Sequence, residues 1–150
     1  VGQASFLLHP LTELIGKHVL AGNKVHADDT TAPTLSPGKG KTATGRYWTY
    51  VRDNRPCGDD TPPAVWLKYS ENRQGIHPET HLKGFAGVLQ ADAFAGYNGV
   101  YTGKVIAAGC WAHVRRRFYD LTQSGGCHRI NGNNSDNYTQ NRYWKPCMIG

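Results

Sequence analysis

Two aspartates stand out because each lies in, or at the end of, an apolar run. Asp28 belongs to the segment VHADDT, and Asp92 ends the segment GVLQAD. A carboxylate in such a place costs free energy unless it is paired, protonated or bound to a metal. If the two strands are neighbours in a sheet, both carboxylates can hold a hard cation such as Mg²⁺ (or Mn²⁺). Two such ions would support phosphodiester cleavage or transfer. The alternative is that both residues simply end strands.

Asp29 directly follows Asp28, and strand alternation places the two side chains on opposite faces. Only one of them can then serve the metal. His26 and Thr30 share the face of Asp28. We interpret both as ordinary strand residues near a polar site, although they would also be placed to orient the carboxylate.

Basic residues supply a second candidate function. Arg115, Arg116 and Arg117 follow one another on a predicted helix, where successive residues are about 100° apart, so at least two of them project into solvent. They would bind a DNA backbone, or they form an ordinary charged helix face. His113 would contact a DNA phosphate or a carboxylate. Lys39, Lys41 and Arg46 form a second basic loop around a Gly-rich turn, which lacks the form of a nucleotide-binding loop and is expected to be a hairpin turn that would contact DNA.

Cys110 and His113 have the spacing of half a zinc site. Cys127 and His128 would have to complete it, and they lie in a segment without helix or strand periodicity. We therefore favour a buried cysteine beside a histidine at the edge of the active site, with a zinc-binding module as the weaker alternative.

The composition fits one basic domain. The chain has 150 residues and 16.5 kDa, with 17 Lys and Arg against 11 acids, a net charge of +6. Such a charge suits a polyanion such as DNA. No run approaches the roughly 20 apolar residues of a membrane span, so no membrane partner is expected. The four cysteines do not have the spacing of a disulfide framework, which favours reduced thiols and a cytoplasmic location.

The elements that must position these residues can be read from periodicity. A helix is expected over 10–22, with Pro10 in its first turn. Strands are expected over 24–35, 46–52, 64–69, 87–92 and 104–108, with a short helix that begins at Pro78. A final helix carries an apolar stripe made by Trp111, Val114, Phe118 and Leu121. This order predicts an α/β fold with a mixed sheet and helices on its faces, in which Trp48, Tyr50 and Trp66 are core aromatics.

Four strings in order make the reading more specific: VHADDTTAPTL, GKTATGRYWTYVRD, FAGVLQADAFAGYNGVY and GCWAHVRRRFYDL. They resemble the central catalytic domain of the bacterial IS66-type insertion-sequence transposases, from about Pro10 to about Leu121. The resemblance implies a ribonuclease-H-like, five-stranded mixed sheet and a DDE site in which Asp28 and Asp92 are catalytic. It also implies Mg²⁺, transposon terminal inverted repeats as the DNA partner, and a possible homo-oligomer.

The resemblance weakens where a third acid is required. The family has a Glu on a later helix, whereas only Asp120 and Asp136 follow Asp92 here. We therefore predict a helical lead-in over 1–22, a partial catalytic domain over 23–122, and an aberrant, disordered tail over 123–150 that indicates a frameshift. The expected protein is an inactive catalytic-domain fragment. The alternative is a non-catalytic DNA-binding remnant.

Overall fold

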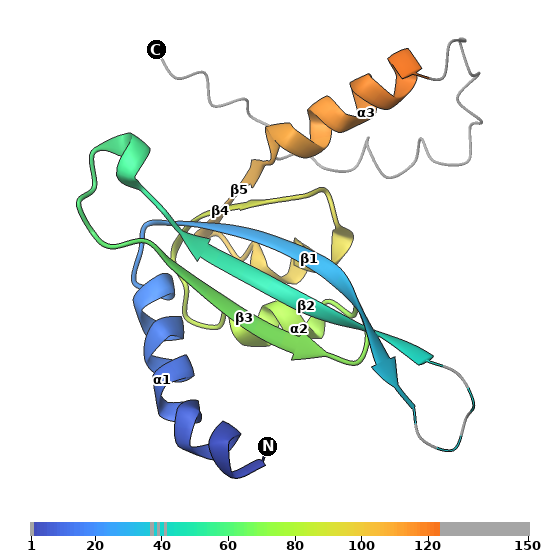
Figure 1. Ribbon diagram of the computed structural model, residues 1–150. Coiled ribbons are helices and arrows are strands. Elements are labelled where there is room, and N and C mark those ends of the chain that lie inside the picture. Colours follow the sequence, from blue (N-terminus) through green and yellow to red (C-terminus); the bar gives the residue numbers. More distant parts are fainter. Residues whose placement is uncertain (1, 37, 39, 41, 124–150) are drawn as a thin grey trace.

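The computed structural model describes residues 2–36, 38, 40 and 42–123. Five strands form one mixed sheet in the order β3-β2-β1-β4-β5 (Figure 1). The strands are β1 (Lys24–Leu35), β2 (Thr42–Arg52), β3 (Ala64–Ser70), β4 (Gly87–Ala91) and β5 (Val105–Gly109). The predicted five-stranded mixed sheet is confirmed, and each expected strand is present with ends that differ by a few residues at most.

The sheet joins two kinds of pairing along β1. β1, β2 and β3 form an antiparallel meander, and β1 pairs with β2 from His26↔Val51 to Leu35↔Thr42. β4 and β5 run parallel to β1. β4 pairs only with the first residues of β1, as far as His26↔Gln90. The second half of β1 therefore continues beyond the end of β4, and this leaves an open corner in the sheet.

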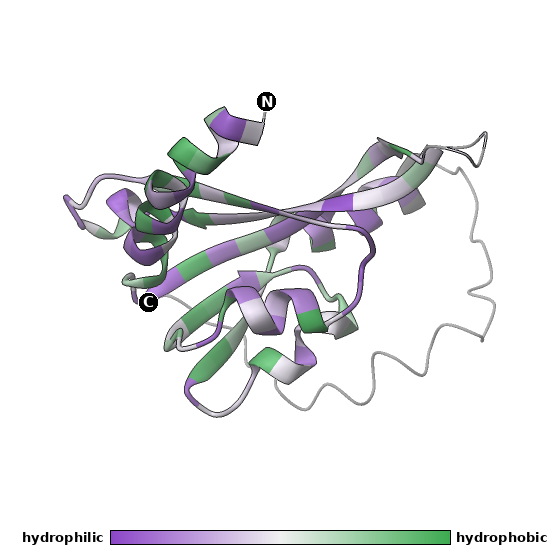
Figure 2. Cartoon of the chain, turned by 90° about the horizontal axis from the view of Figure 1, so that it is seen from below, coloured by the Kyte–Doolittle hydropathy of each residue, from purple (hydrophilic) through white to green (hydrophobic). Residues whose placement is uncertain are grey.

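One face of the sheet carries the core. Trp48, Tyr50 and Trp66 are buried there, as the sequence predicted, together with Val19 of α1 (Gly2–Leu20). The 3-10 helices are η1 (Arg55–Cys57) and η2 (Ala95–Val100), and α2 (Ile76–His81) lies on the core face of the sheet. The opposite face exposes the alternate residues Tyr47, Val65, Leu67 and Tyr69. Figure 2 shows the alternation as bands of hydrophobic and hydrophilic colour along the strands.

The first helix is longer than expected. We predicted that Pro10 would open it, but α1 begins at Gly2 and contains Pro10 in its interior. Proline removes one backbone donor, which favours a helix start without requiring one. The hydroxyl of Thr12 donates to the carbonyl oxygen of His9 at 2.8 Å, beside the proline.

The last helix departs from the expectation in its packing. α3 (Trp111–Gln123) forms where it was predicted, but it projects away from the sheet (Figure 1). Its apolar residues Trp111 and Phe118 are 75% and 64% exposed. An amphipathic pattern predicts an apolar stripe and leaves open what covers it. None of the described helices is long and apolar enough to cross a membrane.

Candidate active site

The open corner brings the two predicted aspartates together. Asp92 comes directly after β4, and continuing the pairing His26↔Gln90 by two residues aligns Asp28 with it. Because the two strands run in parallel register, the Asp28 and Asp92 carboxylates lie side by side at the corner where β4 ends and β1 continues. Asp29 joins them, and carboxylate oxygens of all three residues lie within 4.8 Å of one another. Asp28 and Asp29 therefore lie on opposite faces of β1, as expected, and yet their carboxylate oxygens are close to each other.

Asp28 is the accessible member of the three. Its side chain is 59% exposed. Its Oδ1 accepts a hydrogen bond from the backbone N–H of Asp29 at 2.8 Å and lies 3.9 Å from Nε2 of His113 on α3. Nδ1 of His113 is buried without a hydrogen-bond partner in the described part of the chain. Asp28 thus presents a carboxylate to solvent beside one imidazole.

Asp29 is enclosed by two arginines. Its side chain is completely buried. Nη1 of Arg46, on β2, donates to its Oδ2 at 2.9 Å. Arg73, in the loop between β3 and α2, donates through Nη2 to Oδ1 at 2.7 Å and through Nε to Oδ2 at 2.9 Å. A buried carboxylate needs such partners, and these contacts engage both oxygens of Asp29.

Asp92 shares one of these arginines. Its Oδ1 accepts from the backbone N–H of Phe94 at 3.2 Å, and its Oδ2 accepts from Nη2 of Arg73 at 3.2 Å. The Arg73 guanidinium also lies over the Phe94 ring, 3.9 Å from its centroid. Partial burial disfavours the charged guanidinium, but the hydrogen bonds and negative charges of Asp29 and Asp92 outweigh it and raise the pKa of Arg73.

The arrangement fits a divalent cation at Asp28 and Asp92. Mg²⁺ and Mn²⁺ prefer carboxylate oxygens, and the Asp28 side chain is open to solvent. The Asp92 side chain is 20% exposed and is held by one amide and one guanidinium contact. Asp29 fits a metal less well because both of its oxygens already accept from arginines.

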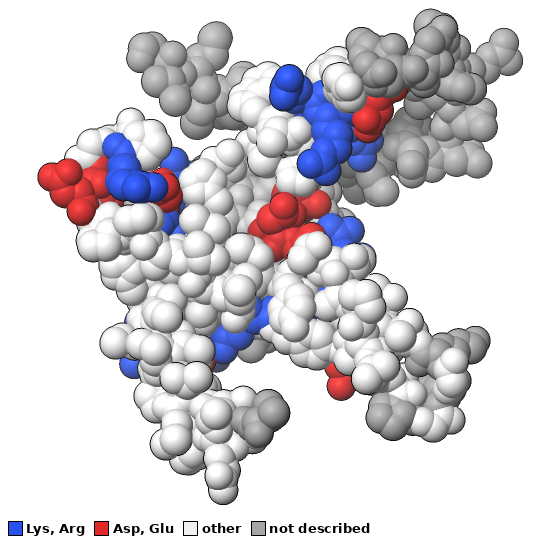
Figure 3. Space-filling model, viewed as in Figure 1, with Lys and Arg blue, Asp and Glu red and all other residues white. Residues whose placement is uncertain are grey.

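Basic side chains lie beside the acids. The α3 helix begins two residues after β5, and the parallel pairing Ala91↔Gly109 places its start next to Asp92. Arg115, Arg116 and Arg117 are all exposed on it. Figure 3 shows the acidic patch at the centre of this face with basic atoms of the α3 region directly next to it. A positive surface at the rim of a carboxylate site suits an approaching DNA backbone.

The family model for "Transposase IS66 family" matches residues 1–140. The chain belongs to the IS66 transposase family. The match is longer than the resemblance recognised in the sequence, because it includes residues 1–9 and extends past Leu121.

Three curated relatives come from Sinorhizobium fredii (strain NBRC 101917 / NGR234). "Uncharacterized protein y4qI" is 41% identical over 133 residues, which cover 83% of this chain and 25% of the relative. "Uncharacterized protein y4hP" is 42% identical over 126 residues, with 81% and 22% covered. "Uncharacterized protein y4jD" is 32% identical over 131 residues, with 83% and 26% covered. The chain thus spans about a quarter of the length of these relatives. No solved structure gives a significant match.

Other residues that the sequence singled out in this IS66 family member have different surroundings from those expected, or lie outside the described residues. Arg46, expected at a basic turn, is bonded to Asp29 inside the site, so it is not available to DNA there. Lys39 and Lys41 lie outside the described residues, as do Cys127, His128 and Asp136. Asp120 is exposed on α3. In the described part of the chain, Cys110 and His113 belong to no group of metal-binding geometry.

Arg73 is the site residue that sequence reasoning missed. It lies in the polar segment ENRQG between β3 and α2, where no periodicity or motif draws attention to it. Only the folded chain carries this loop to the carboxylates.

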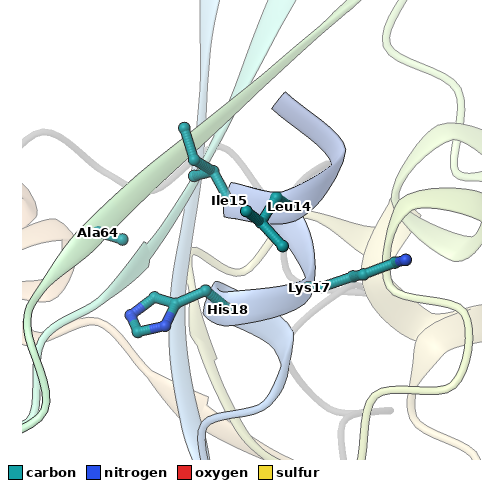
Figure 4. Close-up of a pocket in the computed structure, with 5 residues that line it drawn as sticks. All are labelled: Leu14, Ile15, Lys17, His18 and Ala64. Atoms are coloured by element: carbon teal, nitrogen blue, oxygen red, sulfur yellow. The ribbon is translucent and has the colours of Figure 1, made fainter. Parts of the chain in front are cut away.

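A shallow pocket lies elsewhere, between α1 and the start of β3. Leu14, Ile15, Lys17 and His18 line it from the helix and Ala64 from the strand (Figure 4). Nε2 of His18 lies 2.9 Å from the carbonyl oxygen of Pro62. The lining shares no residue with the carboxylate site.

Proposed function

We propose that this chain carries the carboxylate pair of a DDE-type DNA transposase, on a ribonuclease-H-like sheet. In this proposal Asp28 and Asp92 are catalytic and hold Mg²⁺ or Mn²⁺. The observation that supports it best is the convergence of the two residues at the open corner beside β1 and β4, with oxygens within 4.8 Å. Membership in a transposase family supports the same reading.

In this proposal, different residues of the chain bind the metal, orient a ligand and contact DNA. Asp28 and Asp92 bind the ion from neighbouring strands, and the amide of Phe94 orients Asp92. A bound divalent ion would activate the attacking water or 3′-hydroxyl and stabilise the leaving oxygen. Arg115, Arg116 and Arg117 hold the DNA backbone at the rim, with His113 beside Asp28. The DNA partner is the terminal inverted repeat of a transposon.

The proposal includes an incomplete site. Asp120 and Asp136 are the only acids after Asp92. Of these, Asp120 is exposed on a helix that points away from the sheet. We infer that this chain binds metal and DNA but does not complete strand transfer by itself.

Metal binding is the direct test. Isothermal titration of the 150-residue chain with Mn²⁺ should show one class of site that is lost in Asp28→Asn and in Asp92→Asn. Asp60→Asn removes an exposed acid outside the cluster and should leave the affinity unchanged. Equal Mn²⁺ binding by all four proteins would refute a site at Asp28 and Asp92.

A second candidate, a non-catalytic DNA-binding remnant, is favoured by the three exposed arginines of α3. It predicts salt-dependent affinity for DNA that is indifferent to Mg²⁺ and to Asp28→Asn. Electrophoretic mobility shifts on inverted-repeat DNA, with Mg²⁺ or EDTA, separate the two functions. The catalytic reading further predicts that any Mg²⁺-dependent nicking disappears in Asp92→Ala.

A further inference from the structure

The carboxylate site already contains a cation of its own. Arg73 lies between Asp29 and Asp92, and its Nη2 donates to both, at 2.7 Å and 3.2 Å. Its side chain is only 36% exposed. A guanidinium in this position neutralises part of the negative charge that would attract a divalent ion.

The contacts of Arg73 are unequal. Three hydrogen bonds of 2.7 to 3.1 Å fix it to Asp29, and the Phe94 ring lies under its guanidinium. A single contact of 3.2 Å joins it to Asp92. Arg73 can therefore give up Asp92 while Asp29 and Phe94 still hold it.

We propose that Arg73 is a positioning residue that occupies Asp92 Oδ2 in the metal-free protein and is displaced from it by a divalent cation, so that it weakens metal binding. This inference rests on the proposed function, because it assumes that Asp92 is a metal ligand. The loop before α2 thereby sets the metal concentration at which the site fills.

Arg46 provides a matched comparison. It is also an arginine beside the site, but it donates to Oδ2 of Asp29 and lies on β2. Replacing either arginine by glutamine removes one positive charge near the cluster. Only the Arg73 replacement also frees Asp92, so it should raise the affinity more than the Arg46 replacement does. Repeating the Arg73 replacement in the Asp29→Asn background removes the contribution of its contacts with the Asp29 carboxylate.

The test is the Mn²⁺ dissociation constant of the 150-residue chain, measured by isothermal titration at pH 7. Arg73→Gln should bind Mn²⁺ about tenfold more tightly than the parent chain, because one charge-assisted hydrogen bond no longer competes. Arg46→Gln should change the affinity by less than about threefold, which is the general effect of one nearby charge.

A second pair of variants guards against misfolding, because Arg73→Gln leaves the buried Asp29 with fewer partners. Asp29→Asn removes the buried charge, and Asp29→Asn with Arg73→Gln removes both members of the ion pair. The double variant should bind Mn²⁺ more tightly than Asp29→Asn alone, by a similar factor. Circular dichroism establishes that each variant is folded.

The outcomes separate this inference from the proposed function. If the parent chain binds Mn²⁺ through Asp92 but neither Arg73→Gln comparison shows tighter binding, the role of Arg73 is wrong and the metal site stands. Weaker binding in both comparisons would also overturn it, because Arg73 would then support the site. If no protein in the set binds Mn²⁺, both the inference and the proposed metal site fail.

Discussion

Neighbouring aspartates on one strand have opposite environments. Asp28 is largely exposed, whereas Asp29 is buried between Arg46 and Arg73. The same charge therefore has different energetic roles at the two positions. At Asp28 the carboxylate is available to a ligand, and at Asp29 it is a structural partner of two cations that come from a strand and a loop.

Substitution by alanine should separate these roles. Asp29→Ala removes the carboxylate that Arg46 and Arg73 share, leaves Arg73 with its contact to Asp92, and should lower the free energy of unfolding by about 2–3 kcal/mol. Asp28→Ala should change it by less than about 0.5 kcal/mol, as is usual for exposed positions. Urea unfolding followed by circular dichroism measures both. Equal stabilities would contradict the structural role of Asp29.

His81 is expected to make stability depend on pH. Burial, and then the charges of Lys68 and His77, lower the pKa of His81 to about 4 from an ordinary 6.5, and its Nδ1 lies 3.0 Å from the Tyr50 hydroxyl. The unfolded chain therefore binds a proton at a higher pH than the folded chain does. The contribution of neutral His81 to stability is complete above about pH 6.5 and is lost as pH falls towards 4.

The expected loss over that pH range is roughly 1–2 kcal/mol, less than the full linkage value because the ring is only partly buried. Urea unfolding at pH 7 and pH 4.5 measures it. His81→Gln should show a smaller pH dependence than the parent chain, whereas His9→Gln, at an exposed position, should keep the parent's dependence. An unchanged pH dependence in His81→Gln would exclude His81 as its source.

At the scale of elements, both strands of the β1–β2 hairpin were predicted, although the second was expected over 46–52 and begins at Thr42. β1 and β2 pair so that Leu35 lies opposite Thr42. The same register puts Asp29 opposite Trp48, with Arg46 two residues before Trp48 on β2 and on the same face. A diagonal pair of this kind can interact, so the Asp29–Arg46 contact was within reach of sequence reasoning. Arg73 was not, because a loop has no periodicity from which to place it.

The docking of α1 on β3 depends on a small residue. A Cβ atom at Gly16 would lie 2.6 Å from Cε2 of Trp66. Gly16→Ala should therefore destabilise the fold by about 1–2 kcal/mol, although alanine is the better helix former. Gly2→Ala, on the same helix with open space around it, should be neutral or slightly stabilising. Thermal unfolding of both variants measures the difference, and equal melting temperatures would mean that Trp66 moves aside freely.

At the scale of the whole molecule, whose net charge is +6, the arginines divide between internal ion pairs and the exposed surface. Arg46 and Arg73 form ion pairs with the buried Asp29 carboxylate. Arg115, Arg116 and Arg117 are exposed beside the site. Affinity for DNA should then depend on where positive charge is placed, and not only on how much there is.

Replacing Arg115, Arg116 and Arg117 together by glutamine should weaken DNA binding and reduce the slope of log affinity against log salt by about 2 to 3, since each lost phosphate contact contributes about 0.9. The control replaces three exposed lysines outside α3, Lys17, Lys83 and Lys104, with the same change in net charge. Fluorescence anisotropy on duplex DNA between low and moderate salt measures both. Equal slopes in the two triple variants would remove α3 from the DNA-binding surface.

The sequence by itself indicated the strands, the mixed sheet, the core aromatics and the candidate pair Asp28 and Asp92, because hydrophobic periodicity and residue type are properties of local segments. Tertiary structure alone decided that β1 and β4 are neighbours, that Arg73 lies between Asp29 and Asp92, and that α3 projects from the sheet. These facts depend on which distant segments meet. A pattern of 3.6 or 2 residues fixes the face of an element but not its partner.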